Sequence, residues 1–320
     1  MNRDDLDRLA STHADAIQRH LAEQAGGRCL LLLDPVLRPI SADDTAWASF
    51  DPAGTLPVRV EHPDVDRTYW PLLAPLDTTR FADSELIAQS LREGVQELQP
   101  AQLDAGHGRR IGGWLCSAES NDAVARHLAA SMLHVHPDGY TVWLRLHDPA
   151  VMWALWSILG GVQRAALLGP IDTWHLLDPA GDLLSLSTPL RGVRVRRERL
   201  RLSEAQWADL ASVAALNLAM RARPPGDGHP LERMRADTLD ALRRARGMGF
   251  DDERDLAAFA RRAITVHPRF DHHPLVVQRL QARDPDDYFT GLVDDLSDQD
   301  WQRIGTDMSL PLDARQPISR

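Results

Sequence analysis

The chain contains no lysine: all 36 residues counted as lysine or arginine are arginine. This absence excludes Schiff-base chemistry on a lysine amine and the phosphate-binding lysine of a P-loop. The patterns GxSxG, GxGxxG, HExxH and CxxC are absent as well, so the usual signatures of a serine hydrolase, a dinucleotide fold or a zinc enzyme are missing. The sequence therefore presents no recognisable catalytic set, and we expect a protein that is not an enzyme.

Long hydrophobic runs are also missing. The longest, residues 29–33 and 151–159, are far too short to span a bilayer, and the acidic opening at residues 1–8 lacks the charge pattern of a signal peptide. The net charge of -10 disfavours a dedicated nucleic-acid binder, which needs a basic face to neutralise phosphates. We therefore expect a cytoplasmic protein with neither a nucleic acid nor a membrane as its partner.

Cysteine is scarce, with only Cys29 and Cys116 in the chain. Each lies in an apolar, strand-like run, where a buried reduced thiol is favoured over a disulfide or a metal ligand. Aromatic residues make up 6%, yet nine of them are tryptophan. We expect the majority of these tryptophans in the core. No cofactor and no metal site is expected.

At 320 residues the chain exceeds the size at which one core stops growing. Residues 1–200 mix helical and strand patterns, which predicts a mixed α/β lobe with a central sheet. Residues 201–305 carry helical patterns with almost no strand material, which predicts an all-α lobe, and residues 306–320 read as a flexible tail after Thr306. The expected helices are 4–24, 83–98 (capped by Asp83), 120–133, 231–246, 251–264, 274–282, 286–296 and 297–304; the expected strands are 29–33, 69–73, 111–116, 140–146, 173–177 and 183–186.

The pair His147-Asp148 invites an acid/base interpretation, since an aspartate can orient an imidazole for proton transfer. Neighbouring residues on a strand point to opposite faces, however. Asp148 is better explained as the cap of the following helix, with Pro149 at its first position. We therefore assign the pair to the scaffold.

The densest His/Asp cluster is His267, Asp271, His272 and His273, whose side chains are suitable metal ligands. Pro268 and Pro274 frame it as a loop between helices, and we expect it to shape that link with Phe270 buried beneath it. A further acidic series has no central glycine of a calcium loop, so its members are assigned to solvated and helix-capping roles. That series is Asp284, Asp286, Asp287, Asp294, Asp295, Asp298 and Asp300.

Arginine is most concentrated between residues 191 and 201. Val193 and Val195 alternate with Arg194 and Arg196, which is typical of an edge strand with a charged outer face. The alternative to a solvated edge is a docking surface for an acidic partner, because guanidinium groups pair bidentately with carboxylates. The candidate partner-binding residues are Arg191, Arg194, Arg196, Arg197 and Arg199.

A set of short motifs follows one order along the chain. It comprises Gly113-Trp114-Leu115 with Ser117, Arg126-His127-Leu128, Asp138-Gly139, Leu144-Arg145-Leu146-His147-Asp148-Pro149, Gly169-Pro170-Ile171, Trp174, Phe270-Asp271 with Pro274, and Leu296-Ser297-Asp298 with Trp301. In this order the sequence resembles a domain-of-unknown-function family of type VI secretion adaptors, also called effector chaperones. The resemblance runs from residue 29 to residue 304, with a family core at about residues 28–188. Members commonly carry arginine after the His-Leu and Asp-Pro pairs, where this chain has Ala129 and Ala150.

The resemblance implies a non-enzymatic adaptor that binds a cognate toxic effector and promotes its loading onto the valine-glycine-repeat spike, VgrG. It assigns scaffold roles to Trp114, His127, Arg145, Asp148, Pro149, Gly169, Pro170 and Trp174. Two alternatives stay open: a metal-dependent hydrolase that uses residues 267–273, and an immunity-type inhibitor that neutralises a toxin without delivering it. Bound metal in the purified protein favours the first, and protection from a toxin without association with the spike favours the second.

Overall fold

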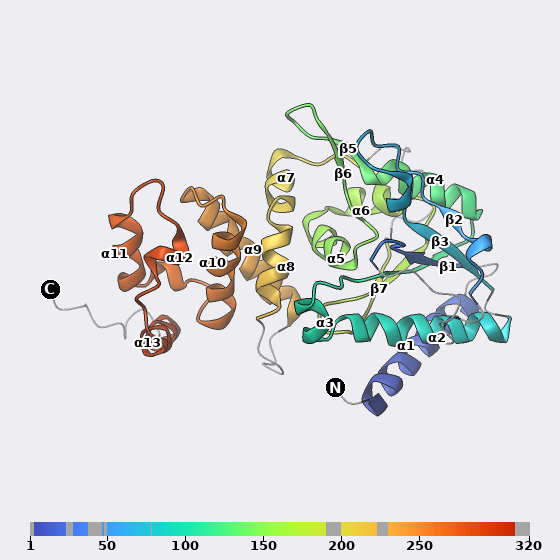
Figure 1. Ribbon diagram of the computed structural model, residues 1–320, viewed down its shortest axis with the longest axis horizontal. Helices are drawn as coiled ribbons and strands as arrows, with labels where there is room; N and C mark the ends of the chain where they lie inside the picture. The colour runs from blue at the N-terminus through green and yellow to red at the C-terminus, as the bar shows by residue number, and fades with distance from the viewer. Residues whose placement is uncertain are drawn as a thin grey trace. The chain divides into compact units, whose positions relative to one another are not determined.

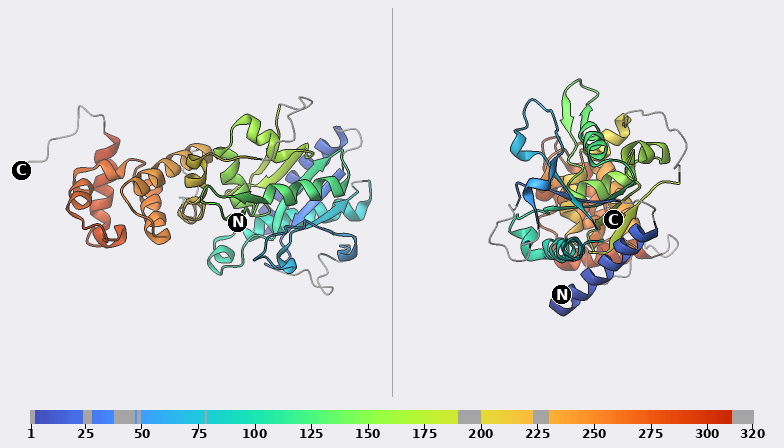
Figure 2. Two further views of the ribbon diagram at one scale, coloured as in Figure 1. Left: turned by 90° about the horizontal axis from the view of Figure 1, so that it is seen from above. Right: turned by 90° about the vertical axis from the view of Figure 1, so that its right-hand side faces the viewer.

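The computed structural model describes residues 3–23, 28–37, 47, 50–77, 79–189, 200–222 and 230–310. The chain divides into two compact units, Met1–Glu204 and Ala205–Arg320. The first contains a six-stranded sheet with helices, and the second is largely helical (Figures 1 and 2). This confirms the predicted fold class. No helix of the described residues has the length and apolarity needed to cross a membrane.

The sheet of the first unit has the strand order β2-β3-β1-β4-β7-β8, and every neighbouring pair is antiparallel. All seven residues of its central strand β4 are buried, because both faces of the sheet are covered. Opposite residues in β1 and β4 include Cys29 and Cys116, and Leu31 and Trp114. The strands are β1 (Arg28–Leu33), β2 (Leu56–Pro57), β3 (Leu72–Leu76), β4 (Ile111–Ser117), β7 (Thr173–Leu177) and β8 (Leu183–Leu186).

Helices lie on both sides of this sheet: Figure 1 shows α1 and α2 below it and α4, α5 and α6 above it. The lower side forms an apolar cluster in which Ile17 of α1 and Leu91 of α2 pack with Trp114 of β4. The recurrence of apolar residues at helical spacing explains how α1 and α2 present one face to the sheet. The helices are α1 (Arg3–Glu23), α2 (Phe81–Glu97), α3 (Pro100–Asp104), α4 (Asn121–Met132), α5 (Pro149–Ile158) and α6 (Gly161–Leu168).

A separate hairpin of β5 (Leu133–Val135) and β6 (Thr141–Trp143) corrects one expectation. The strand predicted for residues 140–146 belongs to this two-stranded sheet and ends at Trp143. Beyond Leu144 the N–H of Leu146 donates to Leu144 O and that of Asp148 to Arg145 O, so the backbone forms turns there and leaves the ladder. Arg145 therefore does not lie on a strand, and the side chains of Leu144 and Leu146 are buried.

Two further boundaries in the first unit differ from the prediction. The strand expected at residues 69–73 begins at Leu72, because Arg67–Tyr69 form a 3-10 helix capped by Asp66. Helix α2 begins at Phe81, so Asp83 lies in its first turn and does not cap it. The Asp83 carboxylate instead accepts a hydrogen bond of 2.8 Å from the N–H of Asp77.

Among its described residues the second unit has helices and no strand. Its core is an aromatic cluster: Phe259 lies 4.8 Å from Phe270 and 5.0 Å from Phe289 between ring centroids, and Trp301 packs 6.0 Å from Phe270. Phe270 is fully buried, as predicted. The helices are α7 (Glu204–Leu210), α8 (Val213–Met220), α9 (Leu231–Gly247), α10 (Glu253–Thr265), α11 (Pro274–Ala282), α12 (Phe289–Leu292) and α13 (Asp298–Ser309).

Two helices of this unit, α12 and α13, differ in extent from the prediction. Only Phe289–Leu292 of the predicted helix 286–296 is helical. The buried carboxylate of Asp255 on α10 accepts the N–H groups of Phe289 and Thr290 and so fixes the start of α12 there. Residues 307–309, which were expected to belong to a flexible tail, are part of α13, and residues 311–320 lie outside the described part of the chain.

Two compositional expectations are confirmed. Cys29 and Cys116 are buried and form no disulfide. Six of the nine tryptophans are buried, namely Trp47, Trp114, Trp153, Trp174, Trp207 and Trp301.

Candidate functional site

The motif residues of the first unit lie on the sheet and on the helices that cover its two faces. Trp114 on β4 and Trp174 on β7 are fully buried. The indole N–H of Trp114 donates to Ser90 Oγ at 2.9 Å, and that of Trp174 donates to Gly112 O at 3.3 Å. A Cβ added to Gly113, whose φ is +131°, would lie 2.4 Å from His175 O. These contacts require a glycine backbone between two large rings, so this motif fixes the packing of the sheet.

Gly169, at the end of α6, lies close against the ring of His127 on α4. Gly169 ends α6 with φ +54°, and a Cβ there would lie 2.2 Å from Cε1 of His127. His127 Nε2 is 2.8 Å from Leu167 O. Burial lowers the pKa of His127 below its ordinary value, and its bond to Leu167 O only partly offsets this effect. A neutral imidazole therefore fills the space that the missing side chain leaves.

The Gly169-Pro170 turn is tied to the end of β4. Ser117 Oγ donates to Pro170 O at 2.7 Å, and the N–H of Ala118 donates to the carboxylate of Asp172 at 3.0 Å. Both bonds join segments more than fifty residues apart in the sequence. Pro170 thus acts through its backbone carbonyl, as part of the framework.

Asp148 caps α5 as predicted: its carboxylate accepts the N–H of Ala150 at 2.9 Å, and Pro149 occupies the first turn. His147 does not pair with Asp148. Its Nε2 lies 3.3 Å from the carboxylate of Asp34, which Arg145 also contacts at 3.2 Å. Asp34 thus joins His147 and Arg145, a contact that local spacing in the sequence did not reveal.

The electrostatics of Asp34 follow from its partners. Burial raises its pKa, but hydrogen bonds from His147 and from the N–H of Val36, together with the charges of His147 and Arg145, hold the pKa below its ordinary value. Asp34 is only 4% exposed. An ionised carboxylate at this point ties the end of β1 to the segment before α5, a tie that stabilises the fold.

The candidate partner-binding arginines, Arg191, Arg194, Arg196, Arg197 and Arg199, lie outside the described residues, as do Val193 and Val195. The exposed apolar side chains of the first unit offer another surface. On the β5–β6 hairpin, which projects from the rest of the unit in Figure 1, Val135 is 69% exposed and Tyr140 is 55% exposed. Tyr140 stacks on His136 with ring centroids 4.4 Å apart. His62 Nε2 lies 3.2 Å from Thr141 O, which links the hairpin to the loop after β2.

The cluster at residues 267–273 does not converge on one point. His267 Nδ1 accepts the N–H of Arg269, and His273 caps α11 while its Nε2 lies 3.2 Å from Asp307. The Asp271 carboxylate is held by two hydrogen bonds of 2.8 Å from Arg244. These side chains thus shape the link between α10 and α11, as expected. A hollow of about 400 Å³ lies beside the cluster and is lined by Met248, Asp271, His272, Val277, Leu280 and Gln281.

A different set of ligand-type side chains does come together in the described part of the chain. His20, Cys116 and His175 offer ligand atoms that all lie within 4.8 Å of one another. Burial, and secondarily the neighbouring His20, lowers the pKa of His175 to about 4. The sequence analysis missed this group, because its members are spread from the first helix to β7 and form no spaced motif.

One family model, described as Domain of unknown function (DUF4123), matches residues 57–166. This family is associated with effector adaptors of the type VI secretion system. The matched segment contains Trp114, His127, Arg145, Asp148 and Pro149, and it ends before Gly169, Pro170 and Trp174. It is thus shorter than the resemblance stated from the motifs. No curated protein and no solved structure matched the chain.

Proposed function

We propose that this protein is a non-enzymatic adaptor of the type VI secretion system, which binds a cognate toxic effector in the cytoplasm and promotes its loading onto the VgrG spike. The observation that carries the proposal is the match of residues 57–166 to a family associated with such adaptors. That segment runs from β2 into α6. It therefore includes the central strand β4 and the hairpin β5–β6, so a family-typical binding surface would be built on this unit.

The geometry of the motif residues supports a binding role. Asp148 is used as a helix cap, His127 fills the space beside Gly169, and His147 pairs with Asp34. Catalytic residues need a side chain within reach of a substrate. Here the polar atoms of Asp148 and His147 interact with other parts of the fold, which suits a scaffold that presents a binding surface.

We place the effector contact on the hairpin, where Val135 and Tyr140 are exposed. Interfaces are enriched in aromatic residues at their buried centre, and both side chains lie inside the matched segment. Tyr140 is already ordered by its stacking on His136, so binding would cost little additional side-chain entropy.

Co-purification with the toxin and the spike protein encoded next to the adaptor gene tests the proposal. We expect the full chain to capture the toxin and to increase the amount of toxin recovered with the spike. Capture of neither protein contradicts the proposal. Protection of cells from the toxin without any association with the spike would instead assign the immunity-type role.

The hairpin assignment is tested with Tyr140→Ser and Val135→Ser. Loss of one central aromatic contact typically weakens an interface by about 2 kcal/mol, or about thirtyfold in Kd. Tyr288→Ser is the matched control, because Tyr288 is 63% exposed and lies in the second unit, outside the matched segment. Equal capture by Tyr140→Ser and by the control would remove the hairpin from the binding surface.

The arginine-rich segment is tested separately, since its charge alone motivates it. Changing Arg194, Arg196 and Arg197 together to Ser removes three cations that could pair with an acidic partner. We expect weaker capture with a reduced dependence on salt concentration. If the variant captures the partner as well as the wild type does, the segment is not a docking surface and the solvated-edge interpretation is favoured.

A further inference from the structure

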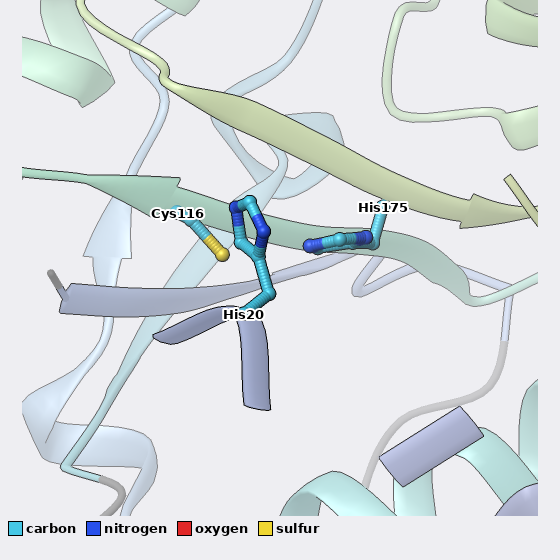
Figure 3. A group of neighbouring side chains, drawn as sticks. All are labelled: His20, Cys116 and His175. Carbon is cyan, nitrogen blue, oxygen red and sulfur yellow. The ribbon is translucent and has the colours of Figure 1, made fainter. Parts of the chain in front are cut away.

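Three side chains with metal-ligating atoms point toward one another, as Figure 3 shows. His20 lies in the last turn of α1, Cys116 on β4 and His175 on β7. Their ligand atoms are within 4.8 Å of one another, and the two imidazole rings are 5.0 Å apart at an angle of 83°. Three separate elements therefore converge on one point.

The strand register accounts for this convergence. Trp114 pairs with His175, and Cys116 pairs with Thr173. Because side chains alternate along a strand, Trp114, Cys116 and His175 share one face of the sheet. Trp114 and Cys116 pack in the apolar cluster that includes α1. The face that carries the thiol and the imidazole is thus the face on which His20 lies.

His175 is already oriented as a ligand would be. Its Nδ1 lies 2.9 Å from Ser185 Oγ, and its Nε2 is buried with no hydrogen-bond partner. In the tautomer whose Nδ1–H donates to Ser185, Nε2 carries a lone pair. Figure 3 shows the far end of this ring directed toward His20 and Cys116. A buried acceptor without a donor is costly, and a cation at this point would remove that cost.

We propose that His20, Cys116 and His175 bind Zn²⁺, with water as the fourth ligand. Imidazole nitrogen and thiolate sulfur are the ligands that zinc prefers, and Ser185 provides the hydrogen bond that commonly orients a metal-bound histidine. Tetrahedral zinc with bonds of about 2.0–2.3 Å holds its ligand atoms roughly 3.3–3.6 Å apart. Because the ligand atoms lie within 4.8 Å of one another, their separations would have to close by at most about 1.5 Å on binding.

Binding is balanced by one proton. Zn²⁺ replaces the proton of the Cys116 thiol, which passes to solvent, while both imidazoles bind in their neutral form. The bound ion would join the end of α1 to the neighbouring strands β4 and β7. It would therefore stabilise the packing of α1, a role independent of effector capture.

Cys29 provides the matched control for the thiol. It lies opposite Cys116 in the neighbouring strand and is equally buried, yet it is not part of the group that meets within 4.8 Å. Cys29→Ala should therefore keep the zinc site, whereas Cys116→Ala should lose it. His20→Gln tests the same site at a half-buried position, where the fold tolerates substitution more readily.

The experiment uses the full chain, stripped with a chelator and titrated with ZnCl₂ against a chromophoric competitor. We expect one zinc per chain, a higher melting temperature with zinc, and slower hydrogen exchange in α1. Affinity should fall by at least about 100-fold in Cys116→Ala and His20→Gln, and by about tenfold in Ser185→Ala.

Circular dichroism without metal establishes that each variant is folded. The absence of stoichiometric zinc binding by the folded wild-type chain would overturn the proposal. Zinc binding that survives Cys116→Ala but is lost in Cys29→Ala would overturn it as well. Because the assay involves neither toxin nor spike, its result is separate from that of the capture experiment.

Discussion

Replacing Glu97 by glutamine should make the protein more stable at alkaline pH. Glu97 ends α2, is only 6% exposed, and accepts the N–H groups of Arg110 at 3.0 Å and of Ile111 at 3.3 Å. Burial, followed by the charge of Glu93 one turn earlier, raises the pKa of Glu97 from 4.5 to about 7, although the two hydrogen bonds and Arg109 oppose this rise. The ionised carboxylate is therefore a destabilising element of the fold.

The magnitude follows from the two pKa values. A difference of one in pKa corresponds to about 1.4 kcal/mol, so a rise from 4.5 to about 7 amounts to about 3 kcal/mol. Because the folded pKa is the higher one, this stability is fully present below pH 4.5 and is lost as the pH rises through 7. Glutamine carries no such dependence, but its amide can accept only one of the two N–H groups well, which costs about 1 kcal/mol.

Urea denaturation followed by tryptophan fluorescence at pH 5 and pH 8 measures the effect. We expect Glu97→Gln to be about 2 kcal/mol more stable than the wild type at pH 8 and about equal to it at pH 5. Glu85→Gln, an exposed position on the same helix, controls for the loss of one negative charge. If the difference between Glu97→Gln and the wild type is the same at both pH values, the reasoning is refuted.

Three other substitutions test the framework. Asp148→Ala removes the cap of α5 and should lower the free energy of unfolding by about 1 kcal/mol, whereas Asp148→Ser should retain most of the wild-type stability. Equal losses in the two variants would contradict the capping role. Asp255→Ala leaves the N–H groups of Phe289 and Thr290 without their acceptor and should cost about 3 kcal/mol, with faster hydrogen exchange at those two amides as the check. Gly169→Ala should lower the free energy of unfolding by more than about 2 kcal/mol, because φ is positive at this position and the new Cβ clashes with His127. Adding His127→Ala should recover part of that loss in a double-mutant cycle. Strict additivity of the two changes would argue against the contact.

Local patterns predicted those features that depend on neighbouring residues. The bounds of α11, Pro274–Ala282, and the cap Asp148 agree with the structure, because caps and helical periodicity act within one or two turns. The limits of β6 and α12 were wrong, since they are decided by partners elsewhere in the chain. For α12 that partner is Asp255, 34 residues earlier.

The candidate sites show the same division. The position of Asp148 directly before Pro149 predicted that it caps α5. The sequence around Asp34 does not indicate that its carboxylate contacts His147 and Arg145, which lie more than a hundred residues away. His20, Cys116 and His175 are separated along the chain by several helices and strands. The register of β4 and β7 and the packing of α1 on the sheet bring them together. Cysteine burial was predicted correctly from the apolar runs, yet burial alone did not reveal the histidines beside Cys116.

The contact between Gly169 and His127 also constrains how this protein can evolve. Any side chain at position 169 would occupy the volume that the His127 ring already fills. Natural selection at either position therefore depends on the residue at the other. A lineage that gains a side chain at 169 must first shrink the residue at 127, and the order of those two changes decides whether the intermediate still folds.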